Sequence, residues 1–132
     1  MEINQEVIAI YGYSQHIDPD GRPSRNDSRY IEKNLYLYED FSFKIIEQNG
    51  RLDPKYESKT GNWEIIEDEL ILHINQKHFI DFSNHNVTEP YTKIIKLIKK
   101  PNYLLEPVEE KKWEYQQGIR PEELFSKYHN KN

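Results

Sequence analysis

The chain has 132 residues and contains no cysteine. This absence excludes disulfides, thiolate catalysis and cysteine-based zinc sites, and it is compatible with any compartment. The sequence also has no apolar run of about 18 residues, the length that a membrane-spanning helix needs, so we expect no membrane span. A chain of this length with 36% hydrophobic residues can bury roughly two-thirds of its unfolded surface. Its stability therefore requires no disulfide, metal or cofactor.

Basic residues are fewer than acidic ones in this chain. Lysine and arginine total 18 against 23 acidic residues, which gives a formal net charge of -5. A general nucleic-acid binder needs a basic surface that contacts phosphates, so we expect no nucleic-acid partner. The solvated face of a strand is the simpler explanation of the one basic cluster, which consists of Lys93, Lys96, Lys99 and Lys100.

The first residues lack the pattern of a signal peptide, because Met1 is followed almost at once by the alternating segment from Glu2 to Tyr13. We expect a cytoplasmic protein. The alternative is an exported protein whose leader is absent from this chain.

What the sequence does contain is alternation of apolar and polar residues, most clearly from Gly61 to Asn75. A turn at Glu67-Asp68 makes this stretch a β-hairpin in which Trp63 pairs with Leu72. Alternate side chains of a strand point to opposite faces. The apolar face of the hairpin is therefore predicted to contain Trp63, Ile65, Leu70, Leu72 and Ile74.

Further strands follow from the same alternation and from β-branched and aromatic content. They are predicted at Glu6 to Tyr13, Tyr30 to Tyr38, Phe41 to Glu47, Lys77 to Phe82, Tyr91 to Lys100 and Tyr103 to Leu105. Residues 91–100 also fit a helical spacing, but their β-branched residues favour a strand.

The C-terminal part has a different character. Trp113 and Tyr115 fit either a last edge strand or a helical turn. Pro121 followed by two glutamates is typical of a helix start, and the apolar residues after it lie at helical spacing, so a short helix is predicted from Pro121 to Tyr128.

Two registers are open for the hairpin of residues 30–47. A two-residue turn at Glu39-Asp40 would pair Tyr38 with Phe41 and place Tyr36 on the apolar face. A three-residue loop would pair Leu37 with Phe41 and leave Tyr36 outside. We favour the second, because one apolar face is then continuous and contains Leu35, Leu37, Phe41, Phe43 and Ile45.

Together these elements predict a mainly β protein: an antiparallel meander that forms a small barrel or a strongly curved sheet, with a short C-terminal helix. We expect a single domain over residues 1–132. Within it, residues 1–107 form the barrel or sheet, and residues 108–132 form a C-terminal extension with a helix at about 121–128.

The order of motifs resembles the small bacterial lipocalin-like domains, which are calycin-type antiparallel barrels. The residues that carry the resemblance lie between 35 and 105: Leu35-x-Leu37, Phe41-x-Phe43, Gly61-x-Trp63, Leu70-x-Leu72, Ile95-Lys96-Leu97 and Leu104-Leu105. Two features depart from the pattern, since Glu39-Asp40 replaces the usual Asp-Gly turn and the C-terminal helix lies outside it. The resemblance implies a barrel with an apolar interior and, through that, a small apolar ligand.

Candidate binding residues lie in a long loop and on a tyrosine face. The segment from Ser14 to Arg29 is rich in turn formers, and structureless loops of this length are usually functional or mobile. Its arginines, Arg22, Arg25 and Arg29, are suited to an acidic partner or anion. Tyr36 and Tyr38 are the other candidates, because tyrosine is enriched where partners bind.

Catalytic and metal-binding patterns are absent from the sequence. His73 and His78 differ in parity, so on one regular strand they point to opposite faces and cannot share a metal. Ser14, His16 and Asp18 lack the surroundings of a catalytic triad. We therefore expect no metal site and no enzyme. The expected function is a non-enzymatic protein-interaction module, such as an inhibitor or immunity-type protein. The alternatives are a lipocalin-like binder of a small apolar ligand and an enzyme with acid/base carboxylates at the barrel mouth.

Overall fold

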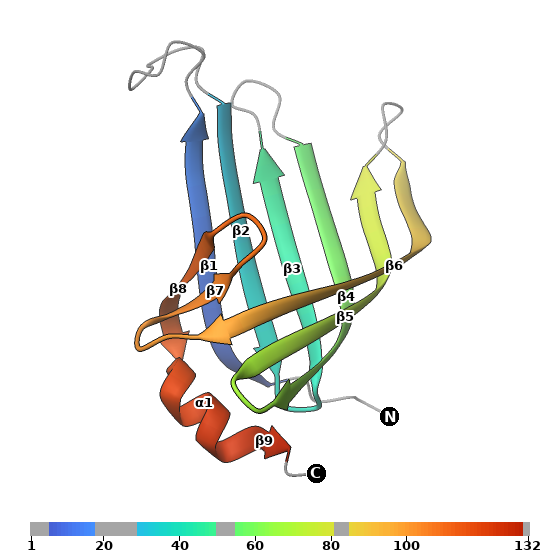
Figure 1. Ribbon diagram of the computed structural model, residues 1–132. Helices are drawn as coiled ribbons and strands as arrows, with labels where there is room; N and C mark the ends of the chain where they lie inside the picture. The colour runs from blue at the N-terminus through green and yellow to red at the C-terminus, as the bar shows by residue number, and fades with distance from the viewer. Residues whose placement is uncertain (1–5, 18–28, 50–54, 81–84, 131–132) are drawn as a thin grey trace.

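The computed structural model describes residues 6–17, 29–49, 55–80 and 85–130. Within these residues the chain is mainly β and forms a closed antiparallel barrel of eight strands with one short C-terminal helix (Figure 1). The strands are β1 (Val7–Ile17), β2 (Arg29–Tyr38), β3 (Ser42–Asn49), β4 (Lys55–Ile66), β5 (Glu69–Ile80), β6 (Asn86–Lys99), β7 (Tyr103–Glu106) and β8 (Lys111–Gly118). The helix α1 (Pro121–Tyr128) and a two-residue strand, β9 (His129–Asn130), follow.

Each strand pairs with its neighbour in sequence, and β8 pairs with β1 to close the barrel. The prediction of an antiparallel meander is confirmed, and the barrel alternative is the one the chain adopts. Strand β8 is thus an integral barrel strand. The barrel boundary expected at residue 107 is therefore wrong, because residues 111–118 pair with both β7 and β1.

The hairpin of β4 and β5 has the predicted register: Ile66 pairs with Glu69, and Trp63 with Leu72. Its predicted apolar face is buried in the barrel, with Trp63 only 2% exposed. A β-bulge interrupts the pairing between Thr60 and Gly61. Gly61 lies there so close to β5 that a Cβ atom would come within 1.8 Å of the backbone oxygen of His73.

The β2–β3 hairpin has a register two residues away from the favoured one. Leu37 pairs with Phe43 rather than with Phe41, so five residues lie between the two members of this pair. The parity was predicted correctly, since Leu35, Leu37 and Phe43 are buried. Phe41 leaves the predicted apolar face because it sits in the turn with a positive φ of 68°. Asp40 holds that turn by accepting a hydrogen bond from the backbone N–H of Ser42 at 3.0 Å.

Several strands are longer than predicted. β1 continues through Ser14 to Ile17, where it pairs with β2, so the loop expected from Ser14 is shorter, and residues 18–28 lie outside the described residues. Residues 77–80 of the strand predicted at 77–82 form the end of β5, and residues 81 and 82 lie outside the described residues. Residues 91–99 lie in β6, which confirms the prediction of a strand there. Polar stretches reach strand length here because cross-strand pairing, rather than apolar content, extends them.

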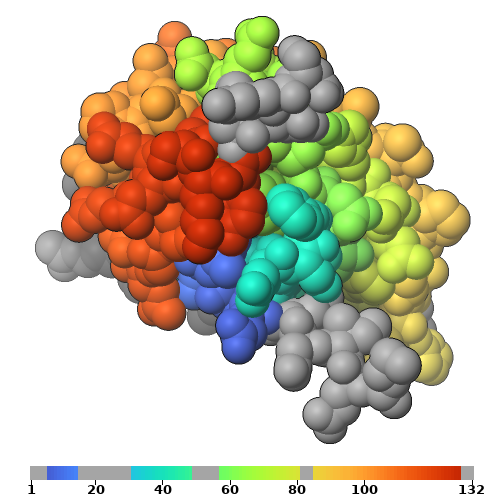
Figure 2. Space-filling model, turned by 90° about the horizontal axis from the view of Figure 1, so that it is seen from below, coloured from blue at the N-terminus to red at the C-terminus, as the bar shows by residue number. Residues whose placement is uncertain are grey.

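The helix α1 has the predicted bounds and closes one end of the barrel, where it buries Pro121, Leu124 and Phe125. Seen from that end, the C-terminal segment (red) lies beside the start of β1 (blue) and the β2–β3 turn (cyan) (Figure 2). We call this the helix end and the opposite end the far end. No helix among the described residues is long and apolar enough to cross a membrane.

An aromatic cluster joins the helix to the two hairpins at this end. The ring centroid of Trp63 lies 4.9 Å from that of Phe41 and 5.3 Å from that of Tyr128. The indole N–H of Trp63 donates a hydrogen bond of 3.1 Å to the backbone oxygen of Tyr38. Trp63 is therefore a core residue, as its position in the hairpin predicts.

The close approach at Gly61 can be tested with Gly61→Ala. We expect a loss of at least about 2 kcal/mol in the free energy of unfolding, because backbone atoms of β5 cannot move aside cheaply. Gly12→Ala is the matched control, since a Cβ atom there meets the flexible end of Gln116, and its cost should stay below about 1 kcal/mol. Urea denaturation of both variants measures the difference, and equal losses would contradict this explanation.

Candidate binding site where the barrel wall is split

The interior of the barrel changes from apolar to charged between the helix end and the far end. On β2, going toward the far end, the buried side chains of Leu37 and Leu35 give way at the next inward position to Lys33. On β3 the buried Phe43 and Ile45 are likewise followed by Glu47. The far half of the barrel therefore contains ionisable side chains where a ligand-carrying barrel would have apolar ones.

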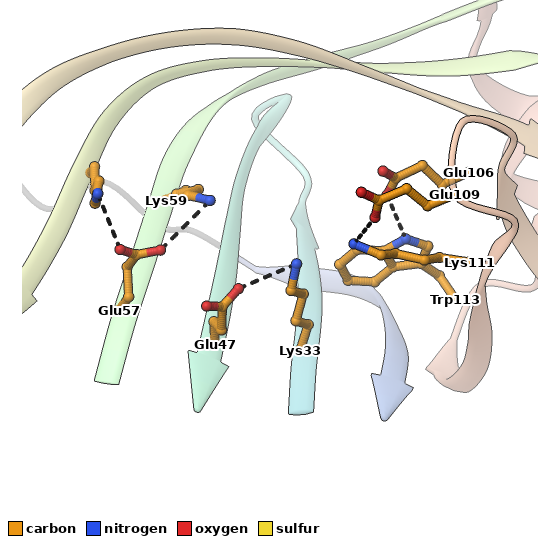
Figure 3. Close-up of polar contacts among 9 residues, drawn as sticks. Lys33, Glu47, Glu57, Lys59, Glu106, Glu109, Lys111 and Trp113 are labelled. Carbon is orange, nitrogen blue, oxygen red and sulfur yellow. Dashed lines mark hydrogen bonds and ion pairs between the residues drawn. The ribbon is translucent and has the colours of Figure 1, made fainter. Parts of the chain in front are cut away.

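These side chains form ion pairs between neighbouring strands and along β4 (Figure 3). Lys33 lies 3.2 Å from the carboxylate of Glu47. The carboxylate of Glu57 contacts two amines, that of Lys59 at 3.6 Å and that of Lys77 at 3.3 Å. All five side chains are between 20% and 28% exposed. Such half-buried pairs neutralise one another's charge but add little net stability.

A second group of charges comes from the β7–β8 turn. Lys111 forms an ion pair with Glu109, and the indole N–H of Trp113 donates to Glu106 at 3.3 Å (Figure 3). The hydrogen bond from Lys111, and then its charge, lower the pKa of Glu109. Burial alone would lower the pKa of Lys111, but the hydrogen bond to Glu109 and the charge of Glu106 outweigh it, so the pKa of Lys111 is raised.

The space left among these groups is a cavity of about 80 Å³, which we call the charged cavity. It is lined by the charged side chains above except Lys77, and by Lys93, Ile45, Ile95 and Trp113. Sites for drug-sized ligands usually enclose at least about 300 Å³. The described interior is therefore too small and too charged for an apolar ligand of that size.

The barrel wall is split beside this cavity. Strand β6 has 14 residues and β7 has four, so only Ile98 and Lys99 pair with β7 (Figure 1). The space between β6 and the β7–β8 turn is a groove of about 490 Å³, which we call the split groove. It contains the exposed side chains of Ile94 and Val108.

The split groove and the charged cavity share four lining residues: Lys93, Ile95, Glu106 and Glu109. The outside of the barrel therefore communicates with its charged interior at this point. Ile94 and Val108 are 55% and 90% exposed, and Val108 is the most exposed of the large hydrophobic side chains in the described part of the chain.

The predicted binding residues that the structure describes lie toward opposite ends of one strand. Tyr36 and Tyr38 lie on the outer face of β2 toward the helix end, whereas Arg29 begins the same strand at the far end. Burial raises the pKa of Tyr38, with smaller contributions from Tyr36 and Asp40. Arg22 and Arg25 lie outside the described residues, as does the side chain of Arg29.

His73 and His78 do not point to opposite faces as predicted, because a β-bulge lies between them. The pairing of β5 with β6 shifts between Ile74 and Gln76, and this shift brings His73 and His78 onto the same outer face. His73 contacts Glu64 at 2.6 Å, while His78 contacts Thr88 at 2.8 Å. Among the described residues, no group of three or more histidine, aspartate or glutamate side chains could hold a metal ion.

Sequence reasoning missed the charged cavity and the split groove. A signal for the cavity exists, since the inward positions of β2 and β3 pass from leucine, phenylalanine and isoleucine to Lys33 and Glu47 without losing parity. No comparable pattern in the sequence indicates the split in the barrel wall. It depends on the difference in length between β6 and β7, and strand lengths are the least reliable feature of a sequence-based prediction.

No family model, no curated protein and no solved structure matches this chain. Only the chain's own residues therefore bear on its function, because a barrel fold by itself supports many different functions.

The pairing of Glu109 with Lys111 can be tested by titration. In Lys111→Met, the pKa of Glu109 should rise toward its ordinary value, because the hydrogen bond and the positive charge that lower it are lost. The pair's contribution to stability is present at neutral pH and disappears as the pH falls through the lowered pKa of Glu109. Carboxyl-detected NMR titration measures the change. Lys112→Met, at the exposed neighbouring position, is the control, and equal Glu109 titration in both variants would contradict the assignment.

Proposed function

We propose that this protein is a non-enzymatic protein-interaction module that binds another protein at the split groove. The observation that carries the proposal is the pair of exposed apolar side chains, Ile94 and Val108, in a groove of about 490 Å³ beside an incomplete wall. Exposed apolar side chains gathered in a groove, rather than scattered singly, are typical of interaction surfaces. The groove replaces the tyrosine face and the arginine loop as the preferred site.

The charges around the groove favour binding over acid/base catalysis. A general acid at neutral pH needs a carboxyl group with a raised pKa, whereas the pKa of Glu109 is lowered by Lys111. The other carboxylates of the charged cavity contact lysine amines or the indole N–H of Trp113. Small acidic domains that act through binding alone include inhibitors and immunity-type proteins, and we place this chain in that functional class.

We also propose that the barrel is lipocalin-like. The closed eight-stranded meander supports this, as do Gly61 and Trp63 in β4 and the leucine pairs in β5 and β7. A small apolar ligand inside the barrel is not favoured, because the charged cavity has a volume of only about 80 Å³.

A photo-crosslinking amino acid at position 108 tests the proposed function in the cells that make the protein. We expect a discrete cross-linked adduct, because Val108 projects into the proposed interface. The same amino acid at Gln48, exposed on β3 across the barrel, is the matched control and should give no adduct. Ile94→Asp should lower the adduct yield by at least about tenfold, since it introduces a desolvated charge into the contact. An adduct that forms at position 48 but not at 108, or that persists in Ile94→Asp, would refute the proposal.

A further inference from the structure

We infer that the partner binds by adding a β-strand to β6, and that the added segment carries two acidic residues separated by two apolar ones. This inference rests on the proposed function, because it names the binding mode and the partner chemistry at the same groove. Strand addition to an open sheet edge is a recurring way to bind an extended peptide.

The first observation is the open edge itself. One edge of β6 pairs with β5 from Asn86 to Ile98. Along the other edge, β7 pairs only with Ile98 and Lys99. Within the described residues, no strand pairs with this second edge from Asn86 to Leu97. An edge of this length presents a row of unpaired N–H and C=O groups to a further strand.

The backbone hydrogen bonds of Lys99 and Lys100 show which groups of β6 face the open edge. The N–H of Lys99 donates to the backbone oxygen of Asp68 on the β5 side, and that of Lys100 donates to Tyr103 on the β7 side. Successive residues of a strand direct their N–H groups to alternate edges. The backbone N–H and C=O groups of Ile94 and Lys96 therefore face the open edge.

The side chains along this edge define what a partner strand must carry. Lys93 and Ile95 line both the groove and the charged cavity, whereas Ile94 and Lys96 lie in the groove only. Cross-strand neighbours are stabilised when charges are opposite or when both side chains are apolar. Residues 93 to 96 read Lys-Ile-Ile-Lys, so the complementary segment reads acidic, apolar, apolar, acidic. The pattern is the same in both strand directions because it is palindromic.

Lys93 is the residue of this edge that most clearly calls for an acidic side chain on the added strand. It is exposed, and among the described residues it makes no ion pair, unlike Lys33, Lys59, Lys77 and Lys111. Glu106 and Glu109 line the same groove. The charge of Lys93 contributes to the lowered pKa of Glu109, but the direct contacts of the two carboxylates are with Trp113 and Lys111. A carboxylate on the inner face of an added strand would therefore complete the pairing of this lysine.

A second copy of this chain fits the edge less well than an acidic segment. In an antiparallel pair formed through the two open edges, residues that face the edge lie opposite one another, so Ile94 lies opposite the other copy's Ile94 or its Lys96. In these registers Lys93 lies opposite the other copy's Ile95 or Leu97, and neither Lys93 nor Lys96 meets a carboxylate. An acidic segment therefore gains opposite-charge pairs that a second copy in these registers lacks.

A displayed library of random ten-residue peptides, selected on the full chain, tests the inference. We expect enrichment of the acidic-apolar-apolar-acidic pattern. The enriched peptide is then synthesised, and its binding is measured by fluorescence anisotropy on two variants at one position. Lys96→Ala removes the charge and keeps the N–H, so it should weaken binding by about two- to fivefold. Lys96→Pro also removes the outward N–H, which an edge strand tolerates, and it should weaken binding by at least a further tenfold.

Hydrogen exchange gives a readout that side-chain docking alone would not change. On peptide binding, the amides of Ile94 and Lys96 should become protected, whereas those of Ile95 and Leu97 are protected beforehand by β5. No enriched peptide, a basic consensus, or equal binding by Lys96→Pro and Lys96→Ala would overturn strand addition. If Lys96→Pro binds normally while position 108 still cross-links to a partner, the proposed function stands and the inference falls. If Lys96→Pro binds normally and position 108 also forms no cross-link, both the inference and the proposed function are refuted.

Discussion

The pairing of β8 with β1 is the constraint on which the rest of the structure depends. Without it, β1 to β8 would form a curved sheet with two open edges, at β1 and at β8. The pairing holds because Tyr11, buried against β8, donates its hydroxyl to the backbone oxygen of Ile119 at 2.7 Å. The N–H of Ile119 in turn donates to Ile8. Gly118, with a φ of 91°, allows the close approach, since a Cβ atom there would lie 2.3 Å from the oxygen of Ile8.

Closure also determines where the helix lies and how the interior is filled. The chain leaves β8 at the helix end of the barrel. Helix α1 therefore packs its apolar side against this end, and Tyr128 contacts Trp63 and Phe41. A closed barrel of eight strands has an interior just wide enough for its own side chains to fill. In this chain the filling is apolar near the helix and ionic beyond it. The ionic half is compatible with partial burial because Lys33, Lys59, Lys77 and Lys111 each contact a carboxylate.

The split in the wall follows from one short strand. Four residues of β7 cannot cover the 14 residues of β6, so the barrel closes around the helix end and opens along one side. Native proteins commonly protect such an edge with lysine and proline, and β6 contains both Lys96 and Pro90. Ile94 is exposed between these protected positions. The edge is therefore guarded against pairing with itself, while an apolar side chain remains available to a complementary segment.

The sequence by itself determined the local features: the β4–β5 register, the inward Trp63, the parity of Leu35 and Leu37, and both ends of α1. These follow from alternation, turn residues and helix-start signals within a few positions of each other, so no distant contact is needed to predict them. The tertiary structure alone decided the features that depend on long-range pairing. These are the strand that Trp113 occupies, the turn position of Phe41, the bulge that turns His78 outward, and the open edge of β6. Strand lengths and closure depend on which distant segment supplies the next hydrogen-bonding partner, and no single stretch of sequence contains that information.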